Sequence, residues 1–307
     1  MARWFNIGGP CNPATNYMLS AMDRLPDVAS LVRKQQYFVV HAPRQCGKTT
    51  AFLSFANETN AKGNAVAMYC SLETLQSFPA AADGIPKLCA CLRNAVRGLP
   101  VLERFAREDW PITHMTAEEV VVSGVQLTLS RMAEVVGKPF YILFDEVDCL
   151  GGETLIPFLR QLRNGKIDMG KGVPFASSVA LIGMRDIRDY KAKIRPDSET
   201  MGSASPFNVI TKAMTLRVFT AEEVAELYAQ HTAETGQVFE PEAVRLAFEF
   251  SGGQPYLVNA LARWCVEKIH GERFGETVTA ADMREAKEKI IRERGTHLDS
   301  LMERMKE

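Results

Sequence analysis

Short apolar runs alternate with helix-length amphipathic segments over the first two thirds of the chain. Five of these runs are rich in Val, Ile, Phe and Tyr, which favour strands: residues 37–41, 65–70, 139–144, 179–184 and 214–219. Apolar residues at helical spacing separate them, as at Phe52 and Ala56 after the first run and at Leu127 and Val135 before the third. Strands that alternate with helices predict an α/β fold with a parallel sheet.

After Phe219 the pattern contains helices only. Helix-start signals follow one another there, either capping boxes or prolines at the first helical position: Thr220 with Glu223, Pro241, Pro255, and Thr279 with Asp282. We therefore expect two domains, an α/β domain over residues 1–219 and a helical domain over residues 220–307.

Composition narrows the function classes. The 307 residues are 46% apolar and 24% charged, with a formal net charge of -1, so no overall positive field gathers nucleic acid or anionic lipid. The seven cysteines form no C-x-x-C pair, which favours reduced thiols in a cytoplasmic protein. No apolar run approaches the ~18 residues that a membrane-spanning helix needs. We expect a cytoplasmic protein with no membrane partner.

The stretch "HAPRQCGKTT", residues 41–50, nearly matches the phosphate-binding loop G-x-x-x-x-G-K-[ST], with Ala42 in place of the first glycine. It lies between a predicted strand and a predicted helix, where backbone N–H groups and the helix dipole bind phosphate. Lys48 would reach the β- and γ-phosphates, Thr49 would supply a hydroxyl to Mg²⁺, and Gly47 would allow close backbone approach. The candidate nucleotide-binding residues of this loop are Pro43, Arg44, Gln45, Cys46, Gly47, Lys48, Thr49 and Thr50.

Cys46 places a thiol inside this loop. Lys48 and the start of a helix lie next to it in the sequence, and both favour the thiolate. We therefore expect a lowered pKa for Cys46 and sensitivity to oxidation.

The stretch "FYILFDEVD", residues 140–148, is a predicted buried strand that delivers carboxylates to the edge where parallel sheets bind ligands. Asp145 would join the Mg²⁺ shell. Glu146 would lie close to the γ-phosphate and orient or deprotonate an attacking water. Asp148 is expected to be a helix cap or to support the other two.

Arg185 follows the fourth predicted strand, where a guanidinium could contact the γ-phosphate. An alternative is a surface ion pair with Asp186 or Asp189. A basic run continues through residues 188–195, and it is either a solvated face or a small patch for nucleic acid.

Five motifs in this order resemble the bacterial AAA-like ATP-binding proteins close to the STAND branch of the AAA+ P-loop NTPases: "HAPRQCGKTT", "YILFDEVD", "LIGMRD", "SPFNV" and "SGGQPYLVNALARW". The resemblance covers nearly the whole chain. It implies a five-stranded sheet of order 5-1-4-3-2 and a C-terminal helical lid, with ATP and Mg²⁺ at their junction. It also implies that Pro255 lies near the adenine, with the segment around Gly8, Gly9 and Pro10 on the other side of the base.

These motifs favour an ATP-binding, slowly hydrolysing AAA+/STAND-like ATPase whose lid position depends on the nucleotide. In this reading Lys48, Glu146 and Arg185 are the catalytic residues, and Thr49 and Asp145 hold the metal. One alternative is a regulatory switch that holds ATP or ADP without turnover. Another is a DNA-associated AAA+ ATPase, supported by the basic run. The protein partner and the oligomeric state stay open.

Overall fold

The computed structural model describes residues 3–185 and 206–293. The chain groups into two compact units. One, here called the helical unit, contains Met1–Arg24, Gln45–Thr50 and Arg217–Glu307; the other, the sheet unit, contains Leu25–Arg44 and Ala51–Leu216. The predicted boundary at residue 219, between an α/β domain and a helical domain, remains a prediction. The structure adds that the first segment of the chain groups with the C-terminal helices.

The sheet unit is built on five parallel strands in the order β2-β3-β4-β1-β5. Their bounds are β1 Tyr37–His41, β2 Val66–Ser71, β3 Phe140–Asp145, β4 Ser178–Gly183 and β5 Lys212–Thr215. The order is 5-1-4-3-2 when read from the other edge, so the predicted fold class is confirmed. The inner strands β3 and β4 are buried almost throughout, which explains their continuous apolar sequence.

The fifth strand was predicted over residues 214–219, and those bounds are wrong. The observed strand is an edge strand that ends at Thr215, with Lys212 and Thr215 exposed. The apolar run beyond it is a connection: Leu216 is buried and its N–H bonds the carbonyl of His41, whereas Phe219 is buried in the core of the helical unit. The run is therefore apolar because it enters two cores, not because it pairs in the sheet.

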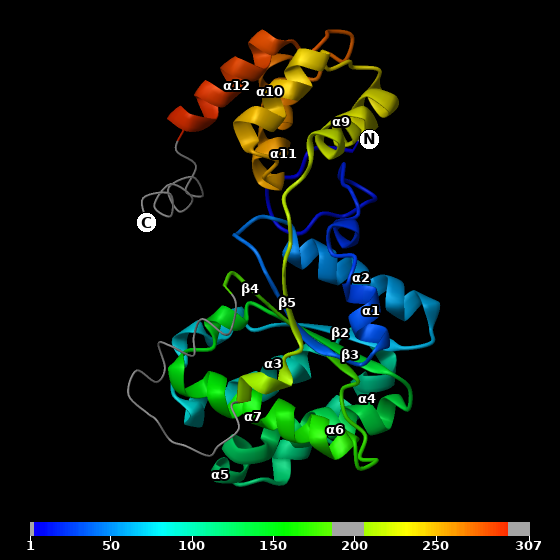
Figure 1. Ribbon diagram of the computed structural model, residues 1–307, viewed down its shortest axis with the longest axis vertical. Coiled ribbons are helices and arrows are strands. Elements are labelled where there is room, and N and C mark those ends of the chain that lie inside the picture. Colours follow the sequence, from blue (N-terminus) through cyan, green and yellow to red (C-terminus); the bar gives the residue numbers. More distant parts are fainter. Residues whose placement is uncertain (1–2, 186–205, 294–307) are drawn as a thin grey trace. The chain divides into compact units, whose positions relative to one another are not determined.

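Helices cover both faces of the sheet, with α1 and α2 on one face and α3, α6 and α7 on the other (Figure 1). The helix bounds are α1 Val28–Arg33, α2 Lys48–Lys62, α3 Ala81–Ala95, α4 Pro100–Glu108, α5 Ala117–Glu119, α6 Val125–Val136 and α7 Gly152–Met169. The helix expected before β3 is present as α6, but its buried face was misplaced. Leu127 and Val135 are 37% and 41% exposed, whereas Leu129 and Met132 are fully buried.

Helices α9 to α12 belong to the helical unit. Their bounds are α9 Ala221–Thr235, α10 Pro241–Ser251, α11 Pro255–Arg263 and α12 Ala280–Arg292. The capping box at the start of α9 is confirmed: Thr220 Oγ1 accepts from the N–H of Glu223 at 3.2 Å, and Glu223 Oε2 accepts from the N–H of Thr220 at 2.8 Å. Thr279 and Asp282 form the same box on α12. None of the helices in the described part of the chain is long and apolar enough to span a bilayer.

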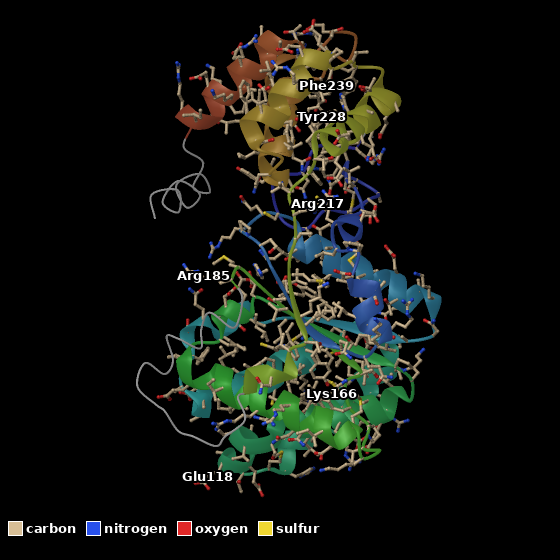
Figure 2. The ribbon with its side chains drawn as sticks, viewed as in Figure 1. Glu118, Lys166, Arg185, Arg217, Tyr228 and Phe239 are labelled. Atoms are coloured by element: carbon tan, nitrogen blue, oxygen red, sulfur yellow. The ribbon has the colours of Figure 1, made fainter. Side chains whose placement is uncertain are left out.

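The N-terminal segment completes the core of the helical unit. Phe5 and Tyr17 are buried, and the Phe5 ring packs edge-on against Tyr228 with the ring centroids 5.6 Å apart. The rings of Tyr228 and Phe239, labelled in Figure 2, pack against each other with their centroids 4.6 Å apart and their planes tilted by 32°. Full burial of such rings contributes about 1.5–3 kcal/mol each. The C-terminal helices therefore depend on residues at the opposite end of the chain.

Candidate functional site

Three of the predicted functional segments begin at the carboxyl-terminal ends of the strands, on the same side of the sheet. The ends of neighbouring strands are in register, because His41 pairs with Gly183 and Phe144 lies beside Leu181. The phosphate-loop sequence leaves β1 there, the two carboxylates follow β3, and Arg185 follows β4. Ala42 continues the strand, since its N–H bonds the carbonyl of Gly183 at 3.2 Å and it is almost fully buried. This explains how alanine can occupy the first position of the loop motif.

Asp145 is a buried carboxylate at the end of β3, only 1% exposed. Its Oδ2 accepts a hydrogen bond from the Tyr69 hydroxyl at 2.7 Å, and its Oδ1 accepts from the N–H of Glu146 at 2.9 Å. Tyr69 lies on the neighbouring strand β2, and the sequence analysis missed it. A buried carboxylate requires donors, so an aromatic hydroxyl on an adjacent strand was the available signal.

Glu146 has left-handed backbone geometry, with φ of +59°. This conformation is strained for a residue with a side chain. Its half-buried carboxylate accepts a weak hydrogen bond from Ser71 Oγ at 3.5 Å. Burial raises the pKa of Glu146, and the nearby carboxylates of Glu73 and Asp145 raise it further. The result is a carboxylate with a raised pKa on a strained backbone, at the carboxyl-terminal end of β3.

Asp148 ties the turn after β3 to the end of β4. Its carboxylate accepts hydrogen bonds from the backbone N–H groups of Met184 and Arg185, the latter at 3.4 Å. It does not cap α7, whose preceding residue is Gly151, so the helix-cap expectation is wrong. Gly183 leaves room for this contact, because a Cβ there would lie 2.6 Å from Asp148 Oδ2.

Arg185 is exposed at the end of β4 (Figure 2). Asp186 and Asp189, the alternative ion-pair partners named above, lie outside the described residues, and so does the basic run 188–195. The structure therefore shows that Arg185 lies two residues beyond the end of β4 and that Asp148 accepts a hydrogen bond from its backbone N–H.

The second half of the phosphate loop is compact and turns through left-handed geometry. Gln45 has φ of +62° and Gly47 has φ of +87°, on either side of Cys46. A side chain at position 47 would be strained there, and its Cβ would lie 3.1 Å from Arg24 Nη2. Helix α2 begins at Lys48, and a helix N-terminus carries the positive end of the helix dipole. Such a turn followed by a helix N-terminus is suited to an anion.

Contacts inside the helical unit bring three predicted binding segments together at this loop. The N–H of Cys11, next to Pro10, bonds Thr50 Oγ1 at 3.1 Å. Gln254 Nε2, next to Pro255, bonds the carbonyl of Gln45 at 3.5 Å.

Gly9 and Pro255, next to these contacts, have backbone geometry that would let a ligand approach the main chain closely. Gly9 has φ of +69°, and Pro255 is buried at the first position of α11. The predicted roles of Gly9, Pro10 and Pro255 around the adenine remain predictions.

The expected activation of Cys46 is wrong. Cys46 is 1% exposed, and burial raises the pKa of its thiol more strongly than Lys48 and Arg24 lower it. Position near a cation and a helix start was readable from the sequence, but burial of the side chain was not. The Cys46 thiol is therefore shielded from solvent, and its pKa is raised and not lowered.

Arg24 is a contact residue that the sequence analysis also missed. It is 5% exposed, and its Nη1 donates to the carbonyl of Cys46 at 3.1 Å. Nothing in the local sequence "AMDRLP" distinguishes it from a surface arginine.

No protein-family model and no curated protein sequence matches the chain. Several solved structures do. The Walker-type ATPase of Pyrococcus abyssi matches 98% of this chain and 79% of its own, with a TM-score of 0.66 and 14% identity. Cdc6p from Pyrobaculum aerophilum matches 88% of this chain and 66% of its own (TM-score 0.55, 11% identity).

The ORC2 protein of Aeropyrum pernix, solved in ADPNP–ADP complexes, matches 92% of this chain and 69% of its own (TM-score 0.51, 14% identity). At these identities the likeness concerns the fold. The Pyrococcus abyssi neighbour is named a Walker-type ATPase, and the chain has the α/β P-loop NTPase fold.

Proposed function

We propose that the chain binds ATP with Mg²⁺ and hydrolyses its β–γ bond slowly, as a STAND-like member of the AAA+ ATPases. One observation carries this proposal. The phosphate-loop sequence follows β1 and the pair Asp145–Glu146 follows β3, at the same carboxyl-terminal end of the two strands that flank β4. Parallel sheets bind ligands at this end. The fold neighbour from Pyrococcus abyssi is itself named a Walker-type ATPase.

The residues present fit a magnesium ion. Mg²⁺ takes oxygen ligands and uses only one or two carboxylates when phosphate supplies the others. Asp145 is a buried carboxylate whose orientation Tyr69 fixes, and Thr49 follows Lys48 in the first turn of α2. When bound, the ion would neutralise charge on the β- and γ-phosphates. Thr49 and Asp145 would hold it.

The loop itself supplies the contacts to phosphate. The turn at Gln45–Gly47 and the first N–H groups of α2 provide backbone donors, and Lys48 adds a positive charge. Gly9, Pro10 and Pro255 would enclose the base, because their neighbours Cys11 and Gln254 contact this loop.

Glu146 would act as the base and Arg185 would contact the γ-phosphate. A base works best when its proton affinity approaches that required at the working pH, and burial raises the pKa of Glu146 in this direction. The carboxylate would accept a proton from the attacking water. Helices α9–α12 would form the lid that reports the nucleotide.

Calorimetric titration with ATP, with Mg²⁺ and then with EDTA, tests the binding half of the proposal. Lys48→Ala should weaken ATP binding by about 10- to 150-fold, the usual worth of a hydrogen bond to a charged group. Lys62→Ala is the matched control, because Lys62 is exposed at the other end of the same helix. No ATP binding by the parent chain would refute the proposed function, and equal affinity of Lys48→Ala would remove the loop from it.

Single-turnover hydrolysis tests the catalytic half. Glu146→Gln keeps the size of the side chain and removes the base, so ATP binding should persist while turnover falls by about 10²–10⁴. Asp145→Asn should also lose Mg²⁺-dependent affinity, because the metal loses a charged ligand.

If the parent binds ATP with no turnover, the chain is the regulatory switch and not the enzyme. The DNA-associated alternative gains no support here, since only Arg185 of the basic run belongs to the described residues.

A further inference from the structure

Arg24 is the only buried arginine or lysine in residues 3–185 and 206–293. It closes the short 3-10 turn Ala21–Arg24 of the N-terminal segment. Its guanidinium lies over the Phe219 ring, 4.8 Å from the ring centre. Burial lowers the pKa of Arg24 to about 10, so the group still carries its charge at neutral pH.

The hydrogen bonds of this charge join two segments that are far apart in the sequence. Nη1 donates both to the carbonyl of Cys46 at 3.1 Å and to the carbonyl of Arg217 at 2.8 Å. The first acceptor belongs to the phosphate loop. The second lies in the connection from β5 to α9, immediately before the capping box at Thr220. One nitrogen therefore serves both segments, and a shift of either carbonyl disturbs the other bond.

The buried charge of Arg24 is satisfied by backbone carbonyls and not by a carboxylate. Arg24 forms no ion pair with a carboxylate, and its Nε has no hydrogen-bond partner among the described residues. Glu223, an acidic group that raises the pKa of Arg24, is itself paired with Arg217 through two hydrogen bonds of 2.5 and 2.7 Å. The contacts that satisfy this charge are therefore two backbone carbonyls and one aromatic ring, and the position of the guanidinium depends on where those groups lie. Arg24 therefore suits a positioning role.

The bond to Cys46 sets the orientation of one peptide group in the loop. A peptide is planar and trans, so the carbonyl of Cys46 and the N–H of Gly47 point in opposite directions. Arg24 holds that carbonyl, and it thereby directs the N–H of Gly47 to the opposite side. Gly47 is left-handed, and consecutive N–H groups around such a residue form an anion-binding concavity.

The second acceptor of Arg24, the carbonyl of Arg217, belongs to a connection that packs closely against the turn before α11. The N–H of Phe219 bonds the carbonyl of Gly253 at 2.8 Å. A Cβ on Gly253 would lie 2.1 Å from the carbonyl oxygen of Phe219, so the two backbones are in close contact. A shift at Arg217–Phe219 would therefore be felt at the start of α9 and in the turn before α11.

We propose that Arg24 is a positioning residue that couples the phosphate loop to the connection Arg217–Phe219. A phosphate bound by the loop reorients or fixes the 46–47 peptide, Arg24 follows the Cys46 carbonyl, and the Arg217 carbonyl moves with it. The inference rests on the proposed ATP binding and extends it. It names the residue that would transmit nucleotide binding from the phosphate loop to helices α9–α12.

Three full-length variants test the coupling. Arg24→Met keeps an unbranched side chain, somewhat shorter than arginine, and removes both hydrogen bonds. Arg24→Lys keeps the charge with a single ammonium donor. Arg131→Met removes an exposed arginine paired with Glu134 on α6 and is the control. ATP affinity is measured by calorimetry, thermal unfolding reports stability, and hydrogen exchange is followed at residues 217–223 with and without a non-hydrolysable ATP analogue.

We expect Arg24→Met to fold with a lower unfolding temperature, because it loses two hydrogen bonds, to bind ATP at least about 10-fold more weakly, and to lose the nucleotide-dependent protection of residues 217–223. Arg24→Lys should recover part of the affinity and of the protection, and Arg131→Met should match the parent. Parental affinity of Arg24→Met would overturn the inference, and so would weaker binding with unchanged nucleotide-dependent protection.

If Arg24→Met does not fold, the same comparison applies to Arg24→Lys. Its full retention of affinity and protection would then overturn the inference. A parent that binds ATP without any change at residues 217–223 refutes the coupling alone. A parent that binds no ATP refutes the proposed function together with it.

Discussion

Glu146 allows the backbone strain at the candidate site to be measured separately from its chemistry. The residue is left-handed at φ of +59°. Glycine adopts this conformation without the steric cost that a Cβ imposes. Glu146→Gly should therefore be more stable than Glu146→Gln, although both remove the carboxylate.

The expected difference follows from two opposing contributions. A left-handed residue with a side chain costs about 1–2 kcal/mol. Glycine loses about 0.5–1 kcal/mol through its greater freedom in the unfolded chain. The two variants lack the same charge, so the raised pKa of Glu146 does not enter the comparison. Glu146→Gly should exceed Glu146→Gln by about 0–1.5 kcal/mol in the free energy of unfolding.

Urea unfolding at neutral pH gives this difference, and single-turnover hydrolysis is measured on the same samples. Glu272 is the matched control, because it is left-handed at φ of +60° and exposed in the helical unit. Glu272→Gly should gain similar stability over Glu272→Gln with no change in turnover. If Glu146→Gly is less stable than Glu146→Gln by more than about 1 kcal/mol, the left-handed geometry is not a source of strain and the reasoning fails.

The other predictions concern neighbouring contacts. Gly253→Ala should lower the free energy of unfolding by about 1–3 kcal/mol more than Gly252→Ala in urea titrations, because both glycines are left-handed but only a Cβ at 253 meets the Phe219 backbone; equal losses would contradict this. Tyr69→Phe should cost about 1.5–3 kcal/mol in the same assay through the lost hydrogen bond to the Asp145 carboxylate, and a cost near zero would show that the carboxylate finds another donor. Because the pKa of Glu146 is raised in the folded chain, its protonated form contributes stability below the usual value near 4.5 that is lost as pH rises through the raised pKa; relative to Glu146→Gln, the parent should lose stability over that window, and a constant difference would refute the shift. Hydrogen exchange at residues 245–265 should differ between ADP, a non-hydrolysable ATP analogue and no nucleotide if these helices form a lid, whereas three identical profiles would argue against it.

The sheet was readable from the sequence because its inner strands have little freedom. Val39, Leu143 and Leu181 lie on strands buried on both faces, and such strands must be continuous apolar runs bounded by polar turns. The edge strand β5 carries no such constraint, since Lys212 and Thr215 are exposed. The strand was therefore predicted too far along the chain, in the apolar connection that contains Leu216 and Phe219, which are buried without pairing in the sheet.

The sequence predicted the candidate site only where its residues are close together along the chain. The strand, glycine-lysine turn and helix at residues 37–62 follow one another along the chain, and so do Asp145 and Glu146. Tyr69 and Arg24 act across the fold, through strand pairing and a buried turn. Sequence spacing does not encode such contacts, and it does not encode the burial that reverses the expected pKa shift of Cys46.

The grouping of residues 3–24 with the C-terminal helices limits how the chain can be divided. The polypeptide passes between the two units at residues 24–25, 44–45, 50–51 and 216–217, so no single cut yields two complete pieces. A fragment of residues 217–293 alone would lack Phe5 and Tyr17, and the apolar surface they cover would face water. Such a fragment should aggregate or remain loosely folded until a synthetic peptide of residues 3–24 is added in trans. Residues 3–24 are thus an assembly partner of helices α9–α12, and a truncation that removes them acts on the core of the helical unit.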